Sequence, residues 1–257
     1  MSHHLPHAEQ ILKQATADRH TLLSLDFDGT LITRSETPRQ VEFPEELRGI
    51  LRRCAQRAQT TVIVNSGRAV EELRRLIQLD SIGYAGNHGL EIEVGDLVDT
   101  YADTEWRQLL DLCMERLEQL CKAYPDLVVH DKGFTVAVYL GALNIAGREA
   151  VTTACRDVIS NLPGARITPG AELLNIRPAV PASKGTALTR IADWLADRVA
   201  PLPVWSIHMG DDASDEAAFV AAEQQGTAVL VGGLQSVTAG YQLPDPAAVK
   251  AWLNTFA

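Results

Sequence analysis

Short apolar runs alternate along the chain with segments in which apolar residues recur every three or four positions. Apolar runs bounded by turn residues are typical of buried strands, and the longer spacing is typical of helices. The runs predict a strand that starts at residue 22 and continues into residues 26–28, and further strands at 61–66, 82–85, 204–209 and 227–231. The spacing predicts helices over 8–19, 44–58, 69–79, 183–198, 216–224 and 247–256. This alternation predicts an α/β fold with a doubly wound, mostly parallel sheet.

Between these two blocks the pattern changes to a helix followed by two strands, repeated once. Helices are expected over 104–123 and 148–162, and strands at 127–130, 134–140, 165–168 and 172–176. That order describes a small antiparallel sheet covered on one face by two helices. We therefore expect a core domain of residues 1–102 and 181–257, with an inserted α+β lid, or cap, domain of residues 103–180.

The composition argues against several classes of binding partner and site. A formal charge of -10 over 257 residues argues against nucleic-acid and anionic-membrane surfaces, which need clustered Lys and Arg. No apolar run reaches the roughly 18 residues of a membrane span, and the four cysteines lack the spacing of a zinc site or disulfide framework. We expect a cytoplasmic protein that binds a small molecule, and a monomer, although no pattern sets the oligomeric state.

The first predicted strand ends in two carboxylates, in the sequence Asp26-Phe27-Asp28-Gly29-Thr30. On a strand, positions i and i+2 lie on the same side, about 6.6 Å apart, so Asp26 and Asp28 are expected to point together. Two carboxylates in one site repel each other unless they share a cation or a proton. The pair is compatible with metal binding, with a carboxylate nucleophile and its acid/base partner, with both, or with an ordinary Asp-Gly turn.

Other predicted strands also end in polar clusters. Strand 61–66 ends in a hydroxyl followed by a helix start, which is a natural phosphate cradle, although Ser66 is also compatible with a plain helix N-cap. Because ligands of open α/β sheets bind at the carboxyl ends of the strands, we expect these clusters to converge. The residues expected there, besides the first pair, are Ser66, Gly67, Arg68, Lys184, Asp211, Asp212 and Asp215. Such groups suit phosphoryl transfer, and all-oxygen ligands favour Mg²⁺.

The same motifs, in the same order, resemble those of the haloacid dehalogenase-like phosphatases. The resemblance implies that Asp26 attacks phosphorus and that Asp28 is the general acid/base. Ser66 and Lys184 would hold the phosphoryl oxygens, together with Gly67 and Arg68. The Mg²⁺ ligands implied by this reading are Asp26, Asp28 and Asp211, with direct or water-mediated support from Asp212 and Asp215.

A second set of motifs resembles the trehalose-6-phosphate phosphatase family within that group. These motifs are Gly86-Asn87-His88-Gly89 with Glu91, Asp131-Lys132-Gly133-Phe134, and Ile176-Arg177-Pro178. The resemblance implies hydrolysis of trehalose 6-phosphate, with the sugar bound by Asn87, His88, Glu91, Lys132, Asn175 and Arg177.

Two positions depart from that family. His130 and Asn175 stand where the family usually carries glutamates that accept hydrogen bonds from sugar hydroxyls. The chemistry would be unchanged, but another glycosyl phosphate becomes an alternative substrate, such as glucosylglycerol phosphate or glucosyl-3-phosphoglycerate. A non-catalytic sugar-phosphate-binding regulator is a further alternative, which the presence of both Asp26 and Asp28 disfavours. We expect trehalose 6-phosphate to be the substrate.

Overall fold

The computed structural model describes residues 5–13, 18–34, 41–101, 104–170, 172–233 and 238–257. The chain divides into two compact units, which are described separately below. The core unit is Met1–Thr100 with Ala182–Ala257, and the cap unit is Tyr101–Pro181. No helix in the described ranges is long and apolar enough to cross a membrane.

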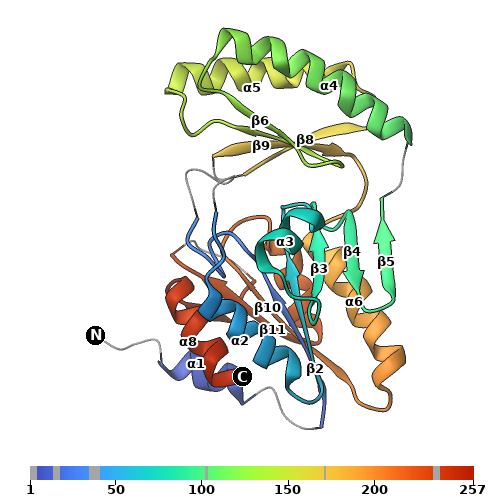
Figure 1. Ribbon diagram of the computed structural model, residues 1–257, viewed down its shortest axis with the longest axis vertical. Coiled ribbons are helices and arrows are strands. Elements are labelled where there is room, and N and C mark those ends of the chain that lie inside the picture. Colours follow the sequence, from blue (N-terminus) through green and yellow to red (C-terminus); the bar gives the residue numbers. More distant parts are fainter. Residues whose placement is uncertain (1–4, 14–17, 35–40, 102–103, 171, 234–237) are drawn as a thin grey trace. The chain divides into compact units, whose positions relative to one another are not determined.

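The core unit contains one large sheet (Figure 1). Its strands are β1 His20–Leu25, β2 Thr60–Asn65, β3 Gly83–Gly86, β4 Glu91–Val94, β5 Leu97–Thr100, β10 Val204–Gly210, β11 Gly226–Val231 and β12 Tyr241–Leu243. Within the described residues their order is β12-β11-β10-β1-β2-β3-β4-β5. All pairs from β12 to β3 are parallel, whereas β3, β4 and β5 pair antiparallel. The predicted fold class, a doubly wound and mostly parallel sheet, is confirmed.

Helices cover both faces of this sheet because side chains alternate along each strand. On β2, Val62 and Val64 join one apolar core, and Ile63 joins the other. The first core is closed by α1 Leu5–Leu12, α2 Glu45–Gln56, α3 Val70–Ile77 and α8 Pro246–Phe256, and the second by α6 Lys184–Val199 and α7 Glu216–Gln224.

Three differences from the predicted elements have simple causes. Strand β12 was not predicted, because three residues are too few to carry a periodic signal. Helix α1 ends at Leu12, and part of the predicted extension to residue 19 lies outside the described residues. Strand β1 ends at Leu25 rather than beyond it, and the chain turns immediately afterwards, which changes the geometry of the first carboxylate pair.

The cap unit has the predicted antiparallel sheet with helices on one face. Its strands are β6 Val128–Asp131, β7 Val136–Tyr139, β8 Ala165–Pro169 and β9 Leu173–Pro178, in the order β6-β7-β9-β8. The helices α4 Thr104–Ala123 and α5 Ile145–Ser160 pack on it through a separate apolar core. Helix α5 begins earlier than predicted because Asn144 caps it, its Oδ1 accepting from Gly147 N at 2.8 Å.

Candidate active site

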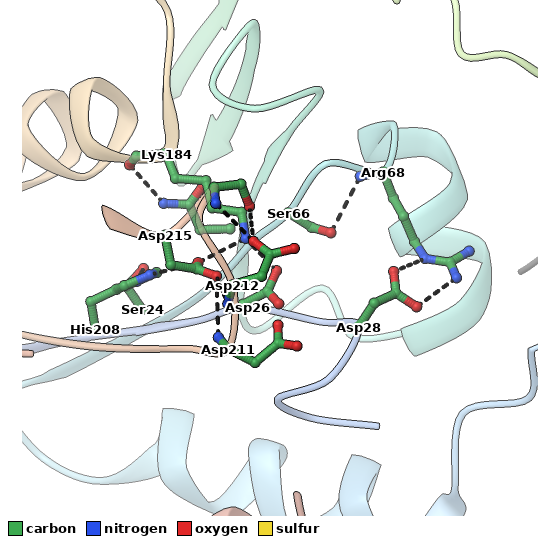
Figure 2. Close-up of polar contacts among 12 residues, drawn as sticks. Ser24, Asp26, Asp28, Ser66, Arg68, Lys184, His208, Asp211, Asp212 and Asp215 are labelled. Atoms are coloured by element: carbon green, nitrogen blue, oxygen red, sulfur yellow. Dashed lines mark hydrogen bonds and ion pairs between the residues drawn. The ribbon is translucent and has the colours of Figure 1, made fainter. Parts of the chain in front are cut away.

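The carboxyl ends of three neighbouring parallel strands bring polar side chains together (Figure 2). β1 lies between β10 and β2, and each of the three strands ends one residue before a candidate group. Asp26 follows β1, Ser66 follows β2 and Asp211 follows β10. The convergence follows from the sheet order, which places these strands side by side although they are far apart in sequence.

A buried lysine links two of the carboxylates. Lys184 Nζ lies 2.6 Å from Asp26 Oδ1 and 2.7 Å from Asp215 Oδ1, and its side chain is 2% exposed. The lysine begins α6, where Ser183 forms a capping box with Thr186. Burial lowers the pKa of Lys184, but the charges of the two carboxylates outweigh it and raise the pKa above its usual value. The side chain is therefore a fixed positive charge beside Asp26.

Three carboxylates form a group with the geometry of a metal site. Asp26, Asp211 and Asp215 each offer an oxygen within 4.8 Å of the others. Gly29 is required for this approach: it has a φ of +93°, and a β-carbon there would lie 2.0 Å from an Asp211 oxygen. Burial raises the pKa of Asp26 well above its usual range, an effect that Lys184 opposes. A divalent cation bound there would favour the ionised carboxylate in the same way.

An arginine that the motifs did not indicate, Arg34, lies beside the carboxylate of Asp211. Arg34 Nη2 donates to Asp211 Oδ2 at 2.8 Å, to Asp212 Oδ2 at 3.0 Å and to the main-chain oxygen of Asp28 at 3.3 Å. Oxygens of three residues thus converge on one positively charged group. Carboxylate and carbonyl oxygens are the hard donors that Mg²⁺ prefers, so the donor set fits that ion. Arg34 carries no signal in the sequence, because it stands alone in a loop.

The expectation that the Asp26 and Asp28 side chains point together is wrong. The Asp28 carboxylate turns toward Arg68, which donates to it from Nε at 2.6 Å and from Nη2 at 2.8 Å (Figure 2). Alternation applies only within a strand, and β1 ends at Leu25, before either aspartate. Among the described residues, the group of metal-competent carboxylates includes Asp26 but not Asp28.

The Ser66-Gly67-Arg68 segment differs in part from the expected phosphate cradle. Ser66 is not the N-cap of α3, since that position is Ala69, and its Oγ accepts from the main-chain N–H of Arg68 at 3.2 Å. The Arg68 guanidinium also pairs with Glu72, and its side chain is 6% exposed. The side chain of Arg68 therefore holds Asp28, while Ser66 remains at the strand end next to Asp26.

The loop after β3 is held by its own side chains. Asn87 and His88 both have positive φ, +49° and +55°, a conformation that persists only where the surroundings enforce it. Asn87 Nδ2 donates to Glu91 Oε2 at 2.6 Å, and the same oxygen accepts from Val70 N at the start of α3. Burial raises the pKa of Glu91. Two residues expected to bind sugar thus bind each other and shape the loop.

His88 is directed toward the neighbouring strand end. Its main-chain N–H donates to the Ser66 oxygen at 3.0 Å. A β-carbon on residue 67 would lie 2.6 Å from the His88 ring, so any larger residue there would displace the imidazole from this position. Gly67 thus provides the space for the imidazole, and Asn87 N also donates to the Arg68 oxygen at 2.7 Å, so this loop contacts the Ser66-Gly67-Arg68 segment through both residues.

In the cap unit, two of the expected residues share one face of the sheet. Leu174 and Ile176 belong to the cap's apolar core, so the alternating residues Asn175 and Arg177 face the opposite way. His130 lies on the same face, because it is paired with Ala137 on β7, and Ala137 is paired with Asn175 on β9. Asn175 is buried, and within the described residues its Oδ1 accepts no hydrogen bond. Burial, with the nearby charge of Arg166, lowers the pKa of Arg177 to about 10.

The turn that carries Lys132 is fixed by an arginine outside the motifs. Arg107 on α4 donates to both carboxylate oxygens of Asp131, at 2.7 Å and 3.0 Å, and Asp131 also accepts from Gly133 N at 2.8 Å. Lys132 N donates to the Thr135 oxygen at 2.8 Å. These contacts hold the main chain of Lys132, Gly133 and Thr135 in the turn that carries the Lys132 side chain.

Comparisons with known proteins agree with this geometry. A family model described as trehalose-phosphatase matches residues 24–246. The chain is 30% identical over 259 residues to the probable trehalose-phosphate phosphatase C of Arabidopsis thaliana, covering 96% of this chain and 79% of that one. It is 28% identical over 263 residues to trehalose 6-phosphate phosphatase RA3 of Zea mays, covering 96% and 72%. The C-terminal domain of a C. albicans trehalose-6-phosphate phosphatase has the same fold, with a TM-score of 0.83 at 16% identity, covering 97% of this chain and 96% of that one.

Proposed function

The chain belongs to the trehalose-phosphatase family, and on that premise we propose that it hydrolyses trehalose 6-phosphate to trehalose and inorganic phosphate. The observation that carries the proposal is the buried Asp26 carboxylate, which shares Lys184 with Asp215 at the carboxyl edge of the sheet. A carboxylate held beside a fixed cation and further acidic groups is equipped to be a nucleophile toward phosphorus.

The proposed cofactor is Mg²⁺. Asp26, Asp211 and Asp215 would hold it, with the main-chain oxygen of Asp28 and the carboxylate of Asp212 nearby, because these oxygens already surround positive charge. When bound, the ion would offset the repulsion between the carboxylates and a phosphate dianion. The expectation that the Asp28 side chain is a ligand is replaced by a role for its main-chain oxygen.

In the first step, an Asp26 oxygen attacks phosphorus and the bond from phosphorus to the sugar oxygen breaks. Lys184 and the Ser66 hydroxyl hold phosphoryl oxygens as charge shifts onto the leaving group. Asp28 donates a proton to the sugar oxygen, which requires its carboxylate to turn away from Arg68. Glu72, already paired with Arg68, keeps that guanidinium partnered during the change.

In the second step, Asp28 takes a proton from water and the water oxygen attacks phosphorus. The bond between phosphorus and Asp26 breaks, which releases inorganic phosphate, restores the Asp26 carboxylate and leaves Asp28 protonated, as it was before the first step. General acid/base catalysis by one positioned residue typically contributes about 10²- to 10⁴-fold. The net reaction consumes one water per phosphate monoester.

We propose that the sugar is bound by His88, Lys132, Asn175 and Arg177, which belong to the motifs shared with the family. Asn175 supports trehalose 6-phosphate despite the replaced glutamate, because its buried amide oxygen has no partner among the described residues and can accept a hydrogen bond from a sugar hydroxyl, as a carboxylate would. The second candidate substrate is another glycosyl phosphate, namely glucosylglycerol phosphate or glucosyl-3-phosphoglycerate. It is favoured by the two positions, His130 and Asn175, that lack the family's usual carboxylates.

Phosphate release distinguishes these substrates. The parent protein and the His130→Glu/Asn175→Glu variant are compared on trehalose 6-phosphate, glucose 6-phosphate, glucosylglycerol phosphate and glucosyl-3-phosphoglycerate. We expect the parent to have its highest kcat/KM with trehalose 6-phosphate. A preference of more than about tenfold for another compound, equal to about 1.4 kcal/mol, together with a swing of the variant toward trehalose 6-phosphate, would reject the assignment.

A further inference from the structure

Two polar side chains lie inside the core sheet, directly beneath the site. Ser24 is on β1 and His208 is on the adjacent strand β10, and the parallel register places them opposite each other. Both are 0% exposed. His208 lies on the α7 side of the sheet, where its ring packs against Phe219 with centroids 5.6 Å apart. Neither Ser24 nor His208 belongs to the motifs that indicated the site.

The pair is joined to the site by direct hydrogen bonds. Ser24 Oγ lies 2.9 Å from His208 Nδ1, and His208 Nε2 lies 3.0 Å from Asp215 Oδ1 (Figure 2). That oxygen is the one that accepts from Lys184 Nζ, which also contacts Asp26. An unbroken series of contacts therefore runs from the interior of the sheet to the proposed nucleophile.

The chemistry of the groups sets the direction of each hydrogen bond. Asp215 Oδ1 accepts from the Lys184 ammonium and Oδ2 accepts from two main-chain N–H groups, so the carboxylate acts as an acceptor on both oxygens. His208 Nε2 must then donate. An imidazole that carries its one N–H on Nε2 has Nδ1 as an acceptor, and the Ser24 hydroxyl, 2.9 Å away, donates to it. Ser24 thus selects the tautomer that can hold Asp215.

Asp215 in turn fixes two further parts of the site. Its Oδ1 positions the Lys184 ammonium, and its Oδ2 accepts from the main-chain N–H groups of Asp211 and Asp212 at 3.2 Å and 3.3 Å. Gly210 leaves room for this carboxylate, since a β-carbon there would lie 2.2 Å from Asp215 Cγ. A shift of Asp215 would therefore move both the lysine and the Asp211-Asp212 turn.

Two polar side chains buried inside an apolar sheet carry a desolvation cost that apolar residues would avoid. We propose that Ser24 and His208 are positioning residues for phosphoryl transfer: the Ser24 hydroxyl orients the His208 imidazole, which holds Asp215 and through it Lys184 and Asp211. This inference rests on the proposed function for its kinetic consequences. The effect of Ser24 and His208 on the positions of Asp215, Lys184 and Asp211 does not depend on which substrate is used.

The test compares variants that remove or restore the donor to Asp215. His208→Leu should lower kcat by about 10- to 100-fold and weaken Mg²⁺ binding, with KM little changed, because supporting partners of ligands typically contribute that much. His208→Gln should retain most of the parent's kcat and Mg²⁺ affinity, because the glutamine amide N–H can donate to Asp215 from near the position of Nε2. Ser24→Ala should also lower kcat and Mg²⁺ affinity. The double variant Ser24→Ala/His208→Leu should lose no more than His208→Leu alone, because Ser24 acts through the imidazole.

The matched control is the other buried histidine on these strands. His20 lies at the opposite end of β1, where its Nε2 contacts Thr61 Oγ1 at 2.9 Å. His20→Leu removes a buried imidazole of the same strand pair without touching Asp215, and should leave kcat and Mg²⁺ affinity unchanged. Thermal unfolding of each variant sets a common assay temperature at which all are folded.

Mg²⁺ binding is measured by calorimetry with the metal alone, alongside kcat and KM. Equal losses of kcat and Mg²⁺ affinity in His208→Leu, His208→Gln and His20→Leu would show a purely structural role and overturn the inference. If the parent released phosphate from no sugar phosphate, the proposed function would fail. The calorimetry would still decide the positioning role: weaker Mg²⁺ binding in His208→Leu and recovery in His208→Gln support it, and unchanged binding in both rejects it.

Discussion

Replacing Lys184 by methionine removes a cation that two buried carboxylates share. The side chain keeps its length, but Asp26 and Asp215, whose side chains are 5% and 0% exposed, lose the ammonium at 2.6 Å and 2.7 Å. Removing one partner of a buried ion pair typically destabilises a protein by about 3–5 kcal/mol, because the remaining charge is left uncompensated. We expect a loss in that range for Lys184→Met at neutral pH, and a kcat lower by about 10²- to 10³-fold.

The stability lost in Lys184→Met should depend on pH in a defined direction. Burial raises the pKa of Asp215, but Lys184 outweighs it and holds the pKa below its ordinary value. A carboxylate with a depressed pKa stabilises the folded state above its unfolded pKa of about 3.9, and that contribution is lost as the pH falls further. The difference between parent and variant should therefore be largest near neutrality and should shrink below about pH 4.

Lys250→Met is the matched control, because Lys250 forms an exposed ion pair with Glu46 at 3.0 Å. Such surface pairs contribute about 0–1 kcal/mol. Urea unfolding of the parent and both variants at several pH values measures the difference. If Lys184→Met cost no more than Lys250→Met, or if its cost grew toward low pH, the reasoning about this buried cluster would be refuted.

Three further outcomes are expected. Excess EDTA should abolish phosphatase activity and Mg²⁺ should restore it; full activity with chelator present would exclude a metal-dependent reaction. Gly29→Ala should weaken Mg²⁺ binding more than Gly164→Ala, because both glycines have positive φ but only the first approaches Asp211; equal effects in calorimetry would contradict this. Lys132→Ala should lower kcat/KM for trehalose 6-phosphate but scarcely for a small aryl phosphate; equal losses would mean that Lys132 acts on the phosphate.

Much of the fold was predictable because its elements are long and their patterns differ. The parallel core and the inserted helix-strand-strand repeat followed from periodicity alone. Strand order was not predictable, because it depends on which strands pair rather than on the pattern within each. It is this order that places β1 between β2 and β10 and so assembles the site.

For the site, the sequence indicated which residue types gather but not where each side chain points. Asp28 was expected beside Asp26, yet a turn that begins one residue earlier directs it to Arg68. Arg34 carried no signal, since a single arginine in a loop has no pattern. Ser24 and His208 did carry one, because each is a polar residue with an apolar neighbour on either side, close before a motif.

The central claim is that Asp26 accepts the phosphoryl group of trehalose 6-phosphate. Rapid acid quench of the parent with substrate labelled at phosphorus tests it most directly, because an acyl phosphate survives acid and is cleaved by hydroxylamine. We predict labelled protein that releases its label to hydroxylamine, with the label mapped to the peptide containing Asp26 and absent from Asp26→Asn. Phosphate release by the parent without any labelled protein, or substantial turnover by Asp26→Asn, would contradict the claim and make water the direct nucleophile.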